Sequence, residues 1–258
     1  MKSLLLKISF FLLSISFFTE SFAQTPTRLV VRAQSKDAKF IGTSMGGAMV
    51  TVRDANTGEL LASGLTRGST GNTELIMNLP RERGKSIVTD DASKFETEIS
   101  ISEPTFVTIT VTAPAGKKQA AVEAQTQLWM IPGKPIDGEG VIVEIPGMVV
   151  DVLSPQTHEV IQLEGARRQL TVRANVVMMC GCPISEGGIW DIRNLEVTAI
   201  VTHNSGESKE YPLAFTGKTS TFAQDIILDD AGSYEITVYA YNSETGNTGL
   251  DKTFIVVR

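Results

Sequence analysis

Four sulfur-bearing residues stand together in the second half of the chain. Met178 and Met179 come directly before Cys180-Gly181-Cys182, which holds both cysteines of the sequence. Thiolate and thioether sulfurs are soft ligands that prefer Cu(I) to hard cations, and a Cys-x-Cys turn can offer two sulfurs to one ion. One interpretation of this loop is therefore a copper site made by Met178, Met179, Cys180 and Cys182, or a thiol redox site at the two cysteines.

The same two cysteines have a second interpretation, which is a disulfide bond. Exported chains with an even number of cysteines usually oxidise them. A turn at this point is expected because Gly181 is conformationally permissive and Pro183 cannot continue a central strand ladder. The residues by themselves leave the disulfide, the copper site and the redox site open.

Residues 1–23 have the features of a secretory signal peptide. Lys2 precedes an apolar stretch, and residues 21–23, Ser-Phe-Ala, form the small-x-small pattern of a cleavage site. We expect the mature protein to begin at Gln24 and to be periplasmic or secreted. No later stretch holds the roughly 18 apolar residues that a membrane helix needs, so no transmembrane segment is expected.

The chain without this segment is long enough for two domains of about 100 to 150 residues each. We expect residues 24–146 to form one domain and residues 147–258 the other, because Ile-Pro-Gly at residues 145–147 interrupts the strand pattern. The formal net charge is −6, and most of the acidic excess lies in residues 147–258. An acidic surface repels phosphate backbones, so nucleic acid is not an expected partner.

Apolar and polar residues alternate with the strand period of two, and β-branched residues crowd the alternating segments. This pattern predicts an all-β protein of two tandem β-sandwich domains. Residues 117–127 have helical propensity, whereas residues 128–130 suit a strand. The expected strands are residues 29–33, 48–53, 74–77, 96–102, 105–112, 141–144, 148–153, 160–163, 169–178, 195–202, 222–228, 234–241 and 253–257.

Residues 230–234, Asp-Ala-Gly-Ser-Tyr, precede an alternating segment near the C-terminus. This pattern resembles the tyrosine corner of immunoglobulin-like sandwiches, and the resemblance covers residues 149–258. It implies that the ring of Tyr234 is buried and that its hydroxyl bonds to the backbone of the preceding turn. The inter-sheet disulfide of antibody domains is missing, because Cys180 and Cys182 are too close in sequence to bridge two sheets.

The first expected domain, residues 24–146, is similar to the transthyretin-like or carboxypeptidase-regulatory-like modules of envelope proteins. The similarity rests on residues 47–52 as a strand, residues 56–62 as a turn with a second strand, and residues 103–113 as a closing strand. Modules of that kind act as scaffolds or bind partners or sugars. The resemblance implies such a role for this chain.

Residues 42–46, Gly-Thr-Ser-Met-Gly, match the G-x-S-x-G nucleophile elbow of lipases. The elbow needs a strand before its serine and a helix after it, but the residues after Ser44 are rich in β-branched side chains and lead into a turn. The two histidines, His158 and His203, lie in the other expected domain, next to turns. We therefore expect no catalytic residue, and no enzyme.

These observations predict an exported, non-enzymatic binding or structural module of the bacterial cell envelope. Its expected partner is another envelope protein or a surface glycan. No cofactor is expected unless the sulfur loop binds copper. The alternative function is that of a periplasmic copper-binding or thiol-redox accessory protein, which would use Met178, Met179, Cys180 and Cys182.

Overall fold

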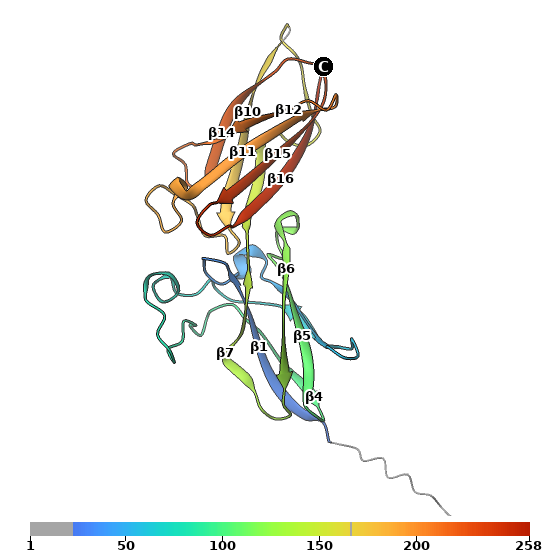
Figure 1. The fold of residues 1–258 in the computed structure, drawn as a ribbon, viewed down its shortest axis with the longest axis vertical. Coiled ribbons are helices and arrows are strands. Elements are labelled where there is room, and N and C mark those ends of the chain that lie inside the picture. The colour runs from blue at the N-terminus through green and yellow to red at the C-terminus, as the bar shows by residue number, and fades with distance from the viewer. Residues whose placement is uncertain (1–22, 166) are drawn as a thin grey trace, which may run out of the picture.

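A computed structural model describes residues 23–165 and 167–258, so the signal peptide predicted at residues 1–23 lies outside the described residues except for its last position. The described chain forms four β-sheets with a few short helical turns, which confirms the predicted all-β sandwich fold. Figure 1 shows two lobes stacked end to end. None of the helices in these ranges is long and apolar enough to cross a membrane.

The N-terminal lobe contains two sheets, with strand orders β4-β1-β7 and β3-β2-β5-β6. In the first sheet, β1 pairs with β4 in antiparallel and with β7 in parallel orientation. The second sheet is antiparallel throughout. The strands of this lobe are β1 (Thr25–Ser35), β2 (Met49–Asp54), β3 (Leu60–Leu65), β4 (Phe95–Ile101), β5 (Thr105–Ala113), β6 (Val122–Met130) and β7 (Ile136–Ile145).

Alternation along the strands builds the core of this lobe. In β5 the side chains of Val107, Ile109 and Val111 are fully buried, and the threonines between them lie on the other face. Successive side chains of a strand point to opposite faces of a sheet, so the sequence Thr-x-Thr-x-Thr exposes one face as it buries the other. The core extends across both sheets and includes Leu29 of β1 and Met130 of β6.

The C-terminal lobe also contains two sheets, with strand orders β13-β14-β10-β8 and β12-β11-β15-β16-β9. Its core is formed between them by aliphatic side chains of β10, β11, β14 and β15. The strands are β8 (Met148–Ser154), β9 (Glu159–Ile161), β10 (Arg168–Met178), β11 (Leu195–His203), β12 (Ser208–Pro212), β13 (Ala214–Phe215), β14 (Thr221–Leu228), β15 (Gly232–Asn242) and β16 (Thr248–Val257).

The helical propensity of residues 117–127 does not produce an α-helix. The chain forms a single 3-10 turn, Lys118–Ala120, and then runs as β6 along the whole of β5. Val122, Ala124 and Leu128 of β6 pack against the core of the N-terminal lobe, while Glu123, Gln125 and Gln127 are exposed. Pairing with β5 and this burial outweigh a helical propensity that amounts to less than about 1 kcal/mol per residue.

The strand expected at residues 74–77 is wrong, because this segment is a π-helical turn, Glu74–Asn78. The Asn72 side chain accepts a hydrogen bond from the backbone N–H of Leu75 at 3.1 Å, which favours a helical start over an extended chain. Pro80 follows shortly after.

Strand β3 was indicated only by the expected turn and second strand at residues 56–62, and the short strands β12 and β13 were not predicted.

Tyr234 stands at the start of β15 and contacts the preceding turn. Its side chain is 7% exposed, and its hydroxyl donates a hydrogen bond to the backbone oxygen of Asp230 at 2.9 Å. Burial raises the pKa of the phenol above its usual range, so the hydroxyl keeps its proton at neutral pH. The ring lies against His203, with 4.7 Å between the two centroids.

We expect Tyr234→Phe to lower the free energy of unfolding by about 1 kcal/mol, because it removes one buried hydrogen bond and leaves the ring in place. Urea unfolding monitored by circular dichroism measures this change. Tyr241→Phe is the matched control, since Tyr241 is 39% exposed and should change stability by less than about 0.5 kcal/mol. Equal stability of Tyr234→Phe and wild type would contradict this role for the hydroxyl.

Candidate functional site

The predicted sulfur loop lies where the two lobes meet. The sulfur atoms of Cys180 and Cys182 lie at disulfide-bonding distance, and neither cysteine is free. Both side chains are buried, with 1% and 5% exposed, and both belong to the core of the C-terminal lobe. In this structure the two sulfurs therefore form a bonded pair within the core of the C-terminal lobe.

The two methionines of the loop point into different cores. Met178 packs with the cysteines in the core of the C-terminal lobe, whereas Met179 packs in the core of the N-terminal lobe. The two residues are adjacent in sequence, and adjacent side chains of an extended chain point in opposite directions. The four sulfur-bearing side chains are therefore divided between two lobes.

Across residues 23–165 and 167–258, no group of three or more His, Cys, Asp and Glu side chains is placed to hold a metal ion. Ser44 lies exposed in a 3-10 turn, Thr43–Met45, and strand β2 follows it in place of a helix. His203 bonds through Nδ1 with the Ser205 hydroxyl at 2.9 Å and through Nε2 with the Ala231 oxygen at 3.2 Å. His203 therefore has local partners within the C-terminal lobe, whereas Ser44 lies in the N-terminal lobe.

The sulfur loop contacts the N-terminal lobe at Met45. A Cβ added to Gly181 would lie 2.7 Å from the sulfur of Met45, so the loop approaches Met45 as closely as a glycine permits. Gly181 also has a φ of +77°, a conformation that other residues rarely adopt. The loop thus serves as a packing contact between the lobes.

Polar bonds reinforce this junction. Asn247 accepts a hydrogen bond from the Gly147 N–H at 2.8 Å and donates one to the Lys36 oxygen at 3.2 Å. The indole N–H of Trp190 donates to the Asp37 oxygen at 2.8 Å. Two segments that are far apart in sequence, around Trp190 and Asn247, therefore both bond to the first turn of the N-terminal lobe, residues 36–38.

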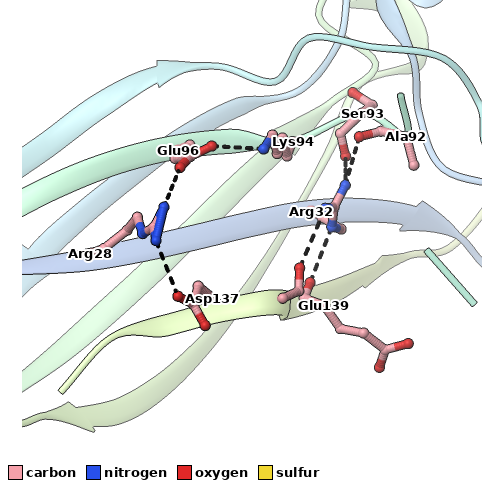
Figure 2. A network of polar contacts seen from close by, with 9 residues as sticks. Arg28, Arg32, Ala92, Ser93, Lys94, Glu96, Asp137 and Glu139 are labelled. Carbon is pink, nitrogen blue, oxygen red and sulfur yellow. Dashed lines mark hydrogen bonds and ion pairs between the residues drawn. The ribbon is translucent and has the colours of Figure 1, made fainter. Parts of the chain in front are cut away.

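A charged groove of about 640 Å³ lies on the outer face of the sheet β4-β1-β7. Arg28 pairs with Glu96 at 3.3 Å and with Asp137 at 3.4 Å, and Lys94 pairs with Glu96 at 2.7 Å. The hydrogen bond and charge of Lys94, together with Arg28, lower the pKa of Glu96 below its usual range. Figure 2 shows this network next to Arg32. Because these charges neutralise one another, the groove has little charge left for a ligand.

Arg32 is the buried member of this network, with 3% of its surface exposed. Its guanidinium donates to the backbone oxygens of Ala92 at 2.6 Å, Ser93 at 3.0 Å and Glu139 at 3.1 Å. Figure 2 shows Arg32 with Ala92 and Ser93 on one side of β1 and Glu139 on the other. Arg32 therefore joins the long β3–β4 connection and the start of β7 to the strand between them.

A second surface, which we call the aromatic face, is the outer face of the sheet β3-β2-β5-β6. Trp129 of β6 is 58% exposed and stands opposite Phe106 of β5, with 5.0 Å between the ring centroids. The next outward pair is Thr108 with Gln127, and the Gln127 amide donates to the Thr108 hydroxyl oxygen at 2.9 Å. Thr110 with Gln125 and Thr112 with Glu123 continue the series.

The outward side chains of β5 and β6 on the aromatic face are mostly polar and nearly uncharged. Strands β2, β5 and β6 are described in full, and the charged side chains that they place on this face are Arg53 and Glu123. Successive outward pairs are about 7 Å apart along the strands. Since the Gln127 amide donates to the Thr108 oxygen, the Thr108 hydrogen and the Gln127 carbonyl oxygen are left for a ligand.

No protein-family model and no curated protein matches this sequence. Similar solved structures include the fibronectin(III)-like modules of Clostridium thermocellum CbhA, with 11% identity, a TM-score of 0.29 and coverage of 89% of this chain and 94% of that chain. The chicken interferon gamma receptor alpha chain has 10% identity, a TM-score of 0.31 and coverage of 90% and 98%. A bacterial ice-binding adhesin has 11% identity, a TM-score of 0.27 and coverage of 90% of this chain and 65% of that chain. At these values the likenesses assign neither a family nor an activity.

We expect Arg32→Met to lower the free energy of unfolding by about 2 kcal/mol, because it leaves buried carbonyl oxygens without a donor. The loss of unfolding free energy stays moderate because methionine has no charge, so the folded protein no longer carries the desolvation penalty of a buried guanidinium. Chemical denaturation measures the change. Arg28→Met is the matched control and should cost less than about 1 kcal/mol, since its ion pairs are half exposed. Equal losses in the two variants would contradict the structural role of Arg32.

For the sulfur loop, we expect thiol titration of the denatured, oxidised protein to find no free thiol. The double variant Cys180→Ser with Cys182→Ser should fold and should lose less than about 2 kcal/mol, because a bridge between residues so close in sequence restricts the unfolded chain very little. Cys180→Ser by itself provides the control, since it must expose one titratable thiol. Two free thiols in the wild type would rule out the disulfide.

Proposed function

We propose that this protein is an exported, non-enzymatic binding module of the bacterial cell envelope, and that the aromatic face binds a neutral surface glycan. The observation that carries the proposal is the exposed Trp129 ring beside Phe106 on the outer face of this sheet. A large aromatic side chain left in solvent offers an apolar platform, and the apolar face of a sugar ring can stack on such a platform.

The residues next to Trp129 support a glycan as the ligand. Threonine hydroxyls and glutamine amides can both donate and accept hydrogen bonds, as sugar hydroxyls do. They stand in register along β5 and β6, so a linear chain of sugars lying along the strands meets the same pair of residue types more than once. The near absence of charge on this face favours a neutral polysaccharide over an acidic one.

The alternation of β6 also supports a binding role. Glu123, Gln125, Gln127 and Trp129 are exposed along the whole strand, while the residues between them face the core. A rigid sheet holds these side chains at fixed spacing, so little conformational entropy is lost when a ligand binds. Sites built on strands are more precisely positioned than sites on loops.

The two family resemblances belong to this proposal. The hydrogen bond from Tyr234 to Asp230 supports a tyrosine corner in an immunoglobulin-like C-terminal lobe. In the N-terminal lobe, Asp54 accepts hydrogen bonds from the N–H groups of Asn56 at 2.7 Å and Thr57 at 2.8 Å, which supports the turn of a transthyretin-like module. We retain the domains as residues 24–146 and 147–258, after a signal peptide at residues 1–23 that would export the chain.

We expect Trp129→Ala to weaken polysaccharide binding at least tenfold, because exposed tryptophans at binding surfaces dominate the binding free energy. Affinity electrophoresis in gels that contain neutral polysaccharides, followed by calorimetry on those that retard the protein, measures the effect. Gln127→Ala should weaken binding by a smaller factor, since it removes one hydrogen-bonding group.

Phe254→Ala is the matched control for Trp129→Ala. Phe254 is an aromatic side chain that is 46% exposed on the C-terminal lobe, so its removal should leave retardation unchanged. Retardation that persists in Trp129→Ala would reject the aromatic face as the glycan site. Capture of an envelope protein through Trp129, with no retardation by any neutral polysaccharide, would replace the glycan by a protein partner.

A further inference from the structure

The long connection between β3 and β4 has an exposed tip, residues 79–86, which we call the tip loop. Every residue from 79 to 86 is exposed. Figure 1 shows this connection extending sideways from the sheets of the N-terminal lobe. A Cβ added to Gly84 would meet no atom within 4 Å, so the tip is surrounded by open space.

The base of the tip loop is anchored to the N-terminal lobe. Ile76 on one side and Ile87 on the other pack against a small core that contains Phe40 and Ala92. The backbone N–H of Ile87 donates to the Glu139 carboxylate at 2.8 Å. Arg32 holds the end of the same connection through Ala92 and Ser93. The N-terminal lobe therefore holds both ends of the tip loop.

The charge of the tip loop is opposite to that of the rest of the protein. Arg81, Arg83 and Lys85 stand against one acidic residue, Glu82, in a chain whose formal net charge is −6. Lys85 pairs with Glu82 at 2.7 Å. The ion pairs found among the described residues do not include Arg81 or Arg83. Two guanidinium groups at the tip are thus available to an anionic partner.

An apolar side chain accompanies these cations. Leu79 begins the tip loop and is 49% exposed. A basic cluster next to an exposed leucine combines the two contributions that hold peripheral proteins on a membrane, which are attraction to anionic head groups and insertion of apolar surface. The acidic remainder of the chain is repelled by such a surface, so the protein would approach it with the tip loop first.

We propose that the tip loop docks this protein onto an anionic lipid surface, with Arg81 and Arg83 at the phosphate groups and Leu79 inserted between the head groups. The proposal does not rest on the glycan site, because the aromatic face and the tip loop share no residue. An envelope protein with both sites would hold a glycan close to a membrane.

The test uses the mature protein and vesicles in co-sedimentation at low ionic strength. Vesicles of phosphatidylglycerol mixed with phosphatidylcholine should bind the protein, and binding should weaken as salt is added, because salt screens charges at an exposed surface. Vesicles of phosphatidylcholine alone should bind much less. Arg81→Gln with Arg83→Gln should weaken binding to the anionic vesicles about 30-fold, at about 1 kcal/mol for each cation near the surface.

The matched control is Lys134→Gln with Lys218→Gln, which removes the same charge from two exposed positions outside the tip loop and should leave binding unchanged. Leu79→Ser should weaken binding several-fold while the salt dependence persists, because it removes only the apolar contribution. All five positions are exposed, and urea unfolding verifies that the variants remain folded.

Three results would overturn the proposal. The first is equal binding to neutral and anionic vesicles, and the second is an Arg81→Gln, Arg83→Gln variant that binds as the control does. The third is binding to dextran sulfate without binding to anionic vesicles, which would assign the loop to acidic polysaccharides. A loss of vesicle binding in the double variant with glycan binding unchanged would support the lipid surface and leave the glycan site to its own test.

Discussion

The alternation of side chains across paired strands is the constraint on which the structure depends. Once the backbone of β5 is bonded to β2 and β6, every second residue must enter the space between the sheets, and the residues between them must leave it. Val107, Ile109 and Val111 take the inner positions. The same rule that fills the core therefore sets threonine, glutamine and Trp129 in rows on the outer face. It also divides Met178 from Met179 at the junction.

At the junction, the two lobes exchange core side chains. Val149 and Met179 come after the expected domain boundary at residues 145–147, yet they pack in the core of the N-terminal lobe. Conversely, Ala38 of the N-terminal lobe packs in the core of the C-terminal lobe. Each lobe thus buries side chains contributed by the other, and the bonds of Asn247 cross the same boundary. The cysteine loop fits this arrangement as a compact turn against Met45.

Charge is used in two different ways on the N-terminal lobe. In the groove of the sheet β4-β1-β7, cations and carboxylates neutralise one another, and the buried Arg32 bonds to backbone oxygens. These groups hold the β3–β4 connection in place. At the tip of that connection Arg81 and Arg83 extend into solvent, where a charge keeps its hydration and can exchange it for an anionic partner. Anchoring at the base and the two cations at the tip are the features on which the proposed lipid contact of this loop rests.

The sequence by itself determined most of the strands, because alternation over five or more residues is a local property that survives in the fold. It also determined the turn at Asp54 and the position of Tyr234, where the residue types act on their own neighbours. The tertiary structure decided the rest. Residues 122–127 form a strand because β5 lies beside them, and that pairing sets Trp129 outward next to Phe106. Burial of Arg32, the contact of Gly181 with Met45 and the two directions of Met178 and Met179 depend on residues distant in the chain. No local pattern encodes such contacts, because burial is fixed by what packs against a side chain and not by its sequence neighbours.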